Sequence, residues 1–166
     1  MVTADLAAPD PSVLESAVHG ADAVLSGLGP RSAADAGITA PGTEAVIRAM
    51  QATGVRRVVV VSASGAFIEE SDDLVTRRLV KPLLGVVLRE SFADTTTMEA
   101  VIRASGLDWT IVRPPRLTDG PHTGRYRTGQ HGVRRGYTVA RADVADCLLS
   151  LVDRSESVGR TITVAR

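Results

Sequence analysis

The sequence contains one cysteine, one lysine and no long apolar run. Cys147 is the one cysteine among 166 residues, which excludes an internal disulfide framework and a cysteine-based metal site. No apolar run approaches the roughly 18 residues of a membrane-spanning helix, and the N-terminus shows no signal-peptide pattern. We therefore expect a cytoplasmic protein that does not span a membrane.

The sequence has no excess of charge of either sign and no metal-binding spacing of its histidines. The 19 basic residues, of which only Lys81 is a lysine, balance 19 acidic residues, so no general attraction to nucleic acid or membranes is expected. The three histidines lack the spacing of metal ligands, and no nucleophile-elbow motif of a hydrolase is present. The apolar fraction is ordinary, and the chain is expected to be globular.

Strand patterns alternate with helix patterns along the chain. Strands are expected at residues 2–4, 22–26, 56–65, 108–112 and 159–165, with a short strand after Tyr137. Helices are expected at residues 10–20, 41–55, 91–104 and from 142 onward. Residues 74–88 are ambiguous because Pro82 and Gly85 interrupt a helical pattern, and residues 120–136 indicate a loop or short hairpin. This order predicts an α/β fold: a doubly wound, mainly parallel sheet in a single domain over residues 1–166.

Three of the expected strands end on residues that suit a flat ligand. Gly27 and Gly29 follow the first, residues 62–65 (Ser-Ala-Ser-Gly) follow the second, and residues 113–116 (Arg-Pro-Pro-Arg) follow the third. Ligands of parallel sheets bind beyond the carboxyl ends of the strands. Glycine lets a ligand approach the backbone, and proline fixes the wall opposite. Each segment alone reads as a turn, whereas three at successive strand ends predict a shared site.

Five segments in order carry a resemblance to a known family: GADAVLSGLG, ATGVRRVVVVSASG, ASGLDWTIVRPPRLTDGP, TGRYR and ARADVADCLL. Together they resemble the atypical short-chain dehydrogenases with an NAD(P)-binding Rossmann fold, in particular the NmrA-like and biliverdin reductase B/flavin reductase group. The resemblance implies NAD or NADP as cofactor, with NADP favoured. The resemblance also implies which residues bind the cofactor. Asp5 and Leu6 would lie at the adenine, and Gly27, Leu28, Gly29 and Arg31 at the ribose and diphosphate. Ser62 and Ala63 would lie beneath the nicotinamide ribose, and Pro114, Arg116 and Leu117 beside the nicotinamide.

The chain departs from typical short-chain dehydrogenases at the proton relay. Ser91 and Thr95 stand where the Tyr-x-x-x-Lys pair is expected, and Ala63 stands at the position of the active-site serine. Flavin and biliverdin reductases of the group also lack this pair, because a delocalised acceptor can take its proton from solvent. The resemblance therefore implies hydride transfer to a flat conjugated acceptor, such as a flavin, quinone or tetrapyrrole. The candidate catalytic residues are Ser62, Ser64 and Arg116, and the candidate substrate contacts are His122 and Arg125.

The chain also departs from the family at its N-terminus. Family members begin with a Gly-x-x-Gly-x-x-Gly phosphate-binding segment about 50 residues before the position of Asp5. Here Met1 stands just before Asp5, so we expect an N-terminally truncated sheet with an exposed apolar edge at residues 22–26. Because such an edge must be covered, we expect either a homo-oligomer or a missing upstream segment. Two alternative functions remain open at this point: a non-catalytic, NmrA-type dinucleotide-sensing regulator, and an inactive fragment.

Overall fold

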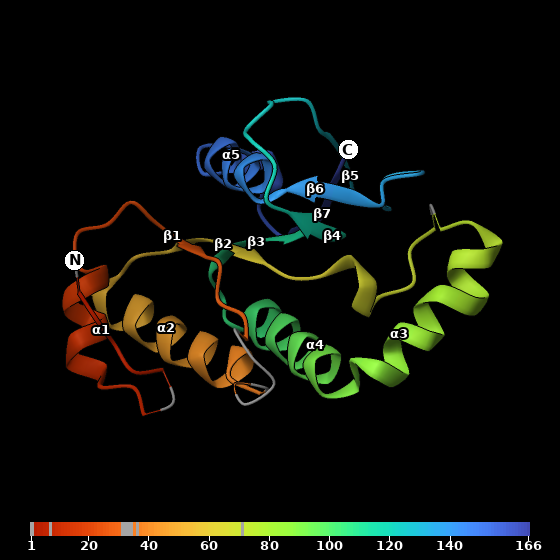
Figure 1. Ribbon diagram of the computed structural model, residues 1–166. Helices are drawn as coiled ribbons and strands as arrows, with labels where there is room; N and C mark the ends of the chain where they lie inside the picture. The colour runs from red at the N-terminus through yellow and green to blue at the C-terminus, as the bar shows by residue number, and fades with distance from the viewer. Residues whose placement is uncertain (1, 7, 31–34, 36, 71) are drawn as a thin grey trace.

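A parallel sheet between two helical layers organises the computed structural model, which describes all residues except 1, 7, 31–34, 36 and 71. The main sheet has five strands in the order β1-β2-β3-β7-β5. Helices α1, α2 and α4 cover one face, and α5 covers the other (Figure 1). The predicted α/β fold with a mainly parallel sheet is confirmed.

The strands of the main sheet are β1 (Ala23–Ser26), β2 (Arg57–Val61), β3 (Asp108–Arg113), β7 (Arg160–Ala165) and β5 (Arg127–Gly129). The first four are parallel, and β5 pairs antiparallel with β7. A second, two-stranded parallel sheet consists of β4 (Arg116–Thr118) and β6 (Thr138–Ala140). The longer helices are α1 (Pro11–Val18), α2 (Thr39–Thr53), α4 (Arg89–Ala104) and α5 (Arg141–Leu151).

The central strands are buried on both faces, which explains their unbroken apolar sequence. Val58 and Val60 of β2 face the cluster formed with α1, α2 and α4, whereas Val59 faces the cluster formed with α5. All three side chains are at most 2% exposed. Successive side chains of a strand point to opposite faces, so one short run of valines supplies both cores.

The helix boundaries follow the local signals in the sequence. The Asp10 carboxylate accepts a hydrogen bond of 2.9 Å from the Ser12 N–H, and Pro11 occupies the first position of α1. Gly54 ends α2 in the left-handed conformation with φ of 76°. Both boundaries were expected from these residues, because a cap depends only on neighbours along the chain.

The ambiguous segment forms a helix in the structure. A π-helical turn, η3 (Thr76–Val80), leads into α3 (Lys81–Val87), and the two form the arm on the right of Figure 1. Pro82 has no N–H, so it cannot form the normal α-helical hydrogen bond to the preceding turn. The wider π turn lies where that bond would be missing.

Two local expectations require correction. Residues 2–4 do not form a strand, because no described strand lies beside them to provide ladder hydrogen bonds. The segment 120–136 is not a local hairpin: its strand β5 pairs with the C-terminal β7, with Arg127 opposite Ala165. At the other edge, β1 pairs within the described chain with β2 alone, and its Leu25 is 39% exposed. No helix of the described residues is long and apolar enough to cross a membrane.

The buried cysteine gives a test of this packing. Cys147 of α5 is 1% exposed, and burial raises the pKa of its thiol to about 11. We expect the folded protein to react very slowly with a thiol-specific reagent, because the thiolate is the reactive form. Labelling in native buffer and in urea should show one thiol that becomes reactive only on unfolding. Rapid labelling of the native protein would show that α5 opens locally.

Candidate functional site

Two loops at the carboxyl ends of β2 and β3 are joined by backbone hydrogen bonds. The Ser62 N–H donates to the Val112 carbonyl at 2.8 Å, and the Ser64 N–H donates to the Pro114 carbonyl at 2.9 Å. These bonds continue the parallel ladder beyond the two strands. Two of the three segments predicted to share a site are therefore adjacent and fixed relative to each other. The third, which contains Gly27 and Gly29, contributes no residue to the cavity that they line.

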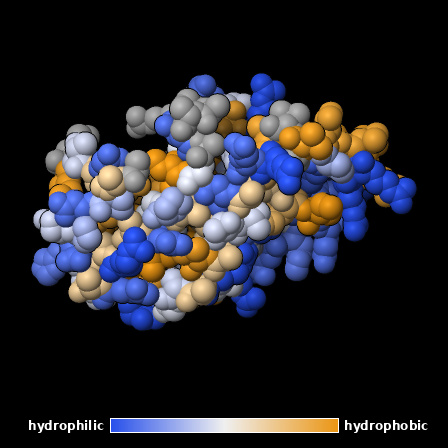
Figure 2. All heavy atoms as spheres, turned by 90° about the horizontal axis from the view of Figure 1, so that it is seen from below, coloured by the Kyte–Doolittle hydropathy of each residue, from blue (hydrophilic) through white to orange (hydrophobic). Residues whose placement is uncertain are grey.

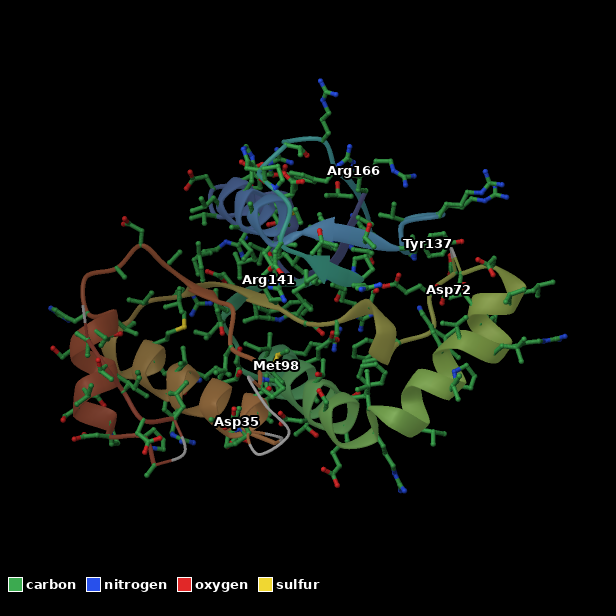
Figure 3. The ribbon with its side chains drawn as sticks, in the orientation of Figure 1. Asp35, Asp72, Met98, Tyr137, Arg141 and Arg166 are labelled. Carbon is green, nitrogen blue, oxygen red and sulfur yellow. The ribbon has the colours of Figure 1, made fainter. Side chains whose placement is uncertain are left out.

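A cavity of about 520 Å³ opens beyond these two loops. Its wall combines the loops with residues from η3, α3, α4, β7 and the segment before β6. The lining residues are Ala63, Ser64, Gly65, Glu69, Asp72, Asp73, Thr76, Val80, Lys81, Leu88, Phe92, Pro114, Pro115, Arg116, Val133, Arg135, Gly136, Tyr137 and Thr163. Figure 3 shows Asp72 and Tyr137 on the same side of the molecule, although they are far apart in sequence.

The structure separates the predicted site residues into two groups. Ala63, Ser64, Pro114 and Arg116 line the cavity. The lining does not include Ser62, whose hydroxyl is directed elsewhere, or Leu117, which packs against the core beneath α5. His122 and Arg125 also lie outside the lining, and Arg31 lies outside the described residues.

The Ser62 hydroxyl belongs to a buried charged network centred on Glu99. It donates to Glu99 Oε1 at 2.6 Å, while the Glu99 side chain has no exposed surface. Arg113 donates to both carboxylate oxygens, at 2.8 Å from Nε and 2.7 Å from Nη2. Arg103, one turn along α4, contributes a further ion pair of 2.7 Å.

The surroundings keep Glu99 ionised. Burial by itself would raise the pKa of its carboxyl group, but the hydrogen bonds from Arg113, Ser62 and Arg103 together hold that pKa below its ordinary value. The network therefore ties α4 to the ends of β2 and β3, directly beneath the cavity wall. No role was predicted for Glu99, and Arg113 was expected only as part of the loop after β3. The spacing of Glu99 and Arg103 on α4 is that of a helical ion pair.

Arg113 also connects the network to the loop that follows β2. Its guanidinium lies 3.5 Å from the centre of the Phe67 ring, and its Nη1 lies 3.9 Å from Glu69. Glu69 in turn accepts a hydrogen bond of 2.8 Å from the Thr163 hydroxyl of β7. One arginine at the end of β3 thus positions two walls of the cavity.

An ion pair of low exposure holds the arm formed by η3 and α3 against the cavity. Lys81 Nζ lies 2.6 Å from Asp72 Oδ2, and the two side chains are 9% and 10% exposed. Lys81 also donates to the Phe67 carbonyl at 2.6 Å. Lys81 is the only lysine of the chain, so the sequence singled it out. Its pairing with Asp72 became clear only in the folded structure.

A phenol and an arginine lie at the outer rim of the cavity. The Tyr137 hydroxyl donates to Asp73 Oδ2 at 3.1 Å, and this hydrogen bond raises the pKa of Tyr137 above its ordinary value. Arg135 has a φ of 58°, a conformation that residues other than glycine rarely adopt. The backbone of this rim is therefore closely constrained.

A second region of predicted cofactor residues lies beyond β1. Leu6 and Leu28 come together over Gly42 of α2: a Cβ on Gly42 would lie 2.6 Å from Leu28 Cδ2 and 3.6 Å from Leu6 Cβ. The segment containing Asp5 and Leu6 is thereby placed next to the loop of Gly27 and Gly29. The sequence resemblance grouped these residues, and the structure brings Leu6 and Leu28 into one cluster.

Two aspartates of α5, Asp143 and Asp146, brace the loop before β5. The Asp143 carboxylate accepts hydrogen bonds from the N–H groups of Thr123 and Gly124, at 2.7 and 3.0 Å. These bonds lower the pKa of Asp143. Asp146 accepts a hydrogen bond of 2.7 Å from the Tyr126 hydroxyl, and burial together with this bond raises the pKa of Tyr126 to about 12.

His122 belongs to the same bracing loop and not to the cavity. Its Nε2 lies 3.4 Å from Asp146 Oδ1, and its side chain is 56% exposed. Arg125 is also exposed. The substrate role predicted for these two residues stays a prediction, since neither is among the residues that line the cavity.

A parallel α/β sheet with a cavity and glycine loops at its carboxyl edge defines a Rossmann-like, nucleotide-binding class of protein. A family model described as NAD(P)H-binding matches residues 1–155, and the chain belongs to this family. A curated relative, described as an uncharacterized sugar epimerase YhfK of Bacillus subtilis (strain 168), is 27% identical over 154 residues. The match covers 90% of this chain and 65% of the relative, so the chain spans slightly less than two thirds of that protein.

Solved structures show the same fold. A putative NAD-dependent epimerase/dehydratase from Bacillus halodurans has a TM-score of 0.77 and 24% identity, covering 99% of this chain and 71% of that one. A short-chain dehydrogenase/reductase from Veillonella parvula in complex with NADP has a TM-score of 0.73 and 21% identity, covering 95% and 68%. ChuY, an anaerobilin reductase from Escherichia coli O157:H7, has a TM-score of 0.75 and 24% identity, covering 99% and 73%.

Proposed function

We propose that this protein is an NAD(P)H-dependent reductase that transfers a hydride to a flat conjugated acceptor. The observation that carries the proposal is the cavity of about 520 Å³ at the carboxyl ends of β2 and β3. Its volume suits a small organic ligand, and its position is where sheets of this class bind ligands. The reductase described among the structural neighbours supports the same chemistry.

The glycine loop after β1 fits a cofactor. A Cβ added to Gly27 or Gly29 would meet no described atom within 4 Å, so no described side chain fills the space next to the backbone at either position. In this proposal, Gly27, Leu28 and Gly29 would hold the ribose and diphosphate, and Asp5 and Leu6 the adenine. NADP is favoured over NAD. The bound cofactor would supply the hydride.

The residues of the chain would orient the reactants and exclude water. Pro114 and Pro115 form a rigid wall, and the Ser64 N–H holds this wall through its bond of 2.9 Å to the Pro114 carbonyl. Small displacements at a reacting centre reduce the rate strongly, so a fixed wall suits hydride transfer. Arg116 and Arg135 would attract an anionic acceptor to the cavity.

The proton would come from solvent. Ser91 and Thr95 stand where the tyrosine and lysine of a relay are expected, and the Thr95 hydroxyl donates to the Ser91 carbonyl within α4. The Ser62 hydroxyl is held by Glu99. We therefore assign Ser62 a structural role, and we assign Ser64 and Arg116 contacts to the reactants.

Steady-state turnover of NADPH with a flavin, a quinone and a tetrapyrrole tests the proposal. The proposal is supported if the protein turns over NADPH and if Arg116→Ala mainly raises KM for an anionic acceptor. Binding of NADPH without any turnover would favour the alternative, a dinucleotide-sensing regulator.

The glycine loop gives a sharper test of the cofactor position. Gly27→Ala adds a methyl group that would meet no described atom within 4 Å, so we expect the thermal unfolding midpoint to be unchanged. In a version that binds NADPH, the same methyl group would occupy ligand space and weaken binding by about tenfold or more. Calorimetric titration measures the affinity, and Gly120→Ala, whose Cβ would make only ordinary contacts of 3.8 Å, is the control. Unchanged affinity of Gly27→Ala would place the cofactor elsewhere.

A further inference from the structure

The arm formed by η3 and α3 carries an unusual concentration of exposed apolar side chains. Val75, Leu79, Leu83 and Val86 are 61%, 66%, 66% and 76% exposed. Their spacing of three or four residues places them on one face of the helical arm. Figure 2 shows hydrophobic side chains gathered at this end of the molecule. Soluble proteins seldom leave such a continuous apolar surface uncovered, so the surface indicates an interaction site.

The charges of the same arm have one sign. Residues 74–87 contain no aspartate or glutamate, and they contain Arg77 and Arg78, which are exposed; the exposed Arg89 follows at the start of α4. None of these three arginines forms an ion pair with another described residue. Lys81 is different, because it is turned inward onto Asp72. The surface of the arm is therefore apolar and cationic, although the whole chain has equal numbers of basic and acidic residues.

We propose that the arm docks the protein on the surface of an anionic lipid bilayer. The apolar stripe would enter the boundary between headgroups and acyl chains, and the arginines would contact anionic headgroups. The arm is too short to span a bilayer and lies along the surface instead. Apolar area and positive charge on one short helix are the two features that this binding mode requires.

A second copy of the chain fits this surface less well. In a two-fold dimer the same patch meets itself, so the arginines of one copy would approach those of the other. No acidic residue lies within the arm to offset that repulsion, and the acidic residues Asp73 and Glu90 lie only at its two ends. Anionic headgroups offset it directly, which is why charge complementarity favours the bilayer.

Docking would also place the cavity next to the bilayer. Val80, in the middle of the arm, and Leu88, just after it, line the cavity and are 44% and 41% exposed. An acceptor dissolved in the membrane would therefore have a short path to the proposed hydride-transfer site. This consequence rests on the proposed function, whereas the docking itself does not.

Vesicle flotation tests the docking. We expect the protein to float with phosphatidylcholine vesicles that contain about one third phosphatidylglycerol, and to bind pure phosphatidylcholine vesicles about tenfold or more weakly. Binding should weaken as salt is raised, because the headgroup attraction is screened. The double variant Leu79→Glu/Leu83→Glu should lose binding, and Arg78→Glu should reduce it by at least about fivefold. Both leucines lie outside the cavity lining, so NADPH turnover in the absence of lipid should be unchanged.

Leu149→Glu on α5 is the matched control, because this leucine is 63% exposed but lies outside the arm. It should bind vesicles like the unchanged protein, and circular dichroism should show the same folded spectrum for all variants. Absence of binding to anionic vesicles at low salt would overturn the proposal, as would equal binding of the double variant. Sedimentation that shows a dimer broken by Leu79→Glu/Leu83→Glu, without vesicle binding, would assign the surface to a second copy and overturn it as well.

Discussion

Replacing Glu99 with alanine is expected to lower the free energy of unfolding by about 3–5 kcal/mol. The carboxylate has no exposed surface and receives hydrogen bonds or ion pairs from Ser62, Arg113 and Arg103. Its removal leaves the Arg113 guanidinium, which is 14% exposed, without its main partner. It also leaves two cationic groups close together, because Arg113 Nη2 and Arg103 Nη2 both contact Glu99 Oε2.

Urea denaturation of the folded chain measures this effect. Arg48→Ala is the control, since its pair with Glu44 has exposed fractions of 65% and 47%, and such a pair contributes about 0–1 kcal/mol. Glu99→Gln retains a hydrogen-bond acceptor without the charge and should lie between the two variants. A loss smaller than about 1 kcal/mol for Glu99→Ala would mean that the network does not hold these elements together.

The same carboxyl group predicts a dependence of stability on pH. The pKa of Glu99 is lowered in the folded protein, so the stabilisation is fully present above the ordinary glutamate pKa of about 4.3 and is lost as pH falls below it. Glu99→Gln has no proton to gain at this position. Its unfolding free energy should therefore fall less steeply between neutral and acidic pH than that of the unchanged protein.

Gly136→Ala is expected to lower the free energy of unfolding by about 1–3 kcal/mol and to disturb acceptor binding. A Cβ at this position would lie closer to Ala165 Cβ than two carbon atoms can approach, and 3.0 Å from Val133 Cγ1. Ala165 is fully buried in β7, so the segment of Gly136 must move instead. That segment carries Val133, Arg135 and Tyr137 into the wall of the cavity.

Gly120→Ala is the matched control in the same half of the chain, since its Cβ would make only contacts of 3.8 Å. Thermal unfolding should separate the two variants clearly. For an active form, Gly136→Ala should raise KM for the acceptor more than it changes the affinity for NADPH, because the adenine half is placed elsewhere. Equal stability of the two variants would show that the backbone around Gly136 yields without cost.

The elements that depend on neighbours along the chain were predictable. The unbroken valines of β2 predicted a strand covered on both faces, and Asp10 with Pro11 predicted the start of α1. The order of strands and helices predicted a parallel sheet, and the ends of β2 and β3 were expected to meet. These features follow from periodicity and caps, in which the residues involved are at most a few positions apart.

Partners far apart in sequence were not predictable. Nothing near Ser62 indicates that its hydroxyl is held by Glu99, which is 37 residues away, and nothing near Glu69 indicates that it accepts a hydrogen bond from Thr163 of β7. The pairing of β5 with β7 was missed for the same reason, and residues 2–4 gave a strand pattern without a neighbouring strand. The sequence by itself thus determined the family, the sheet and the two loops that meet at its edge. Only the tertiary structure decided which side chains form the cavity and which hold it, because burial and charge pairing depend on contacts that the folded chain alone creates.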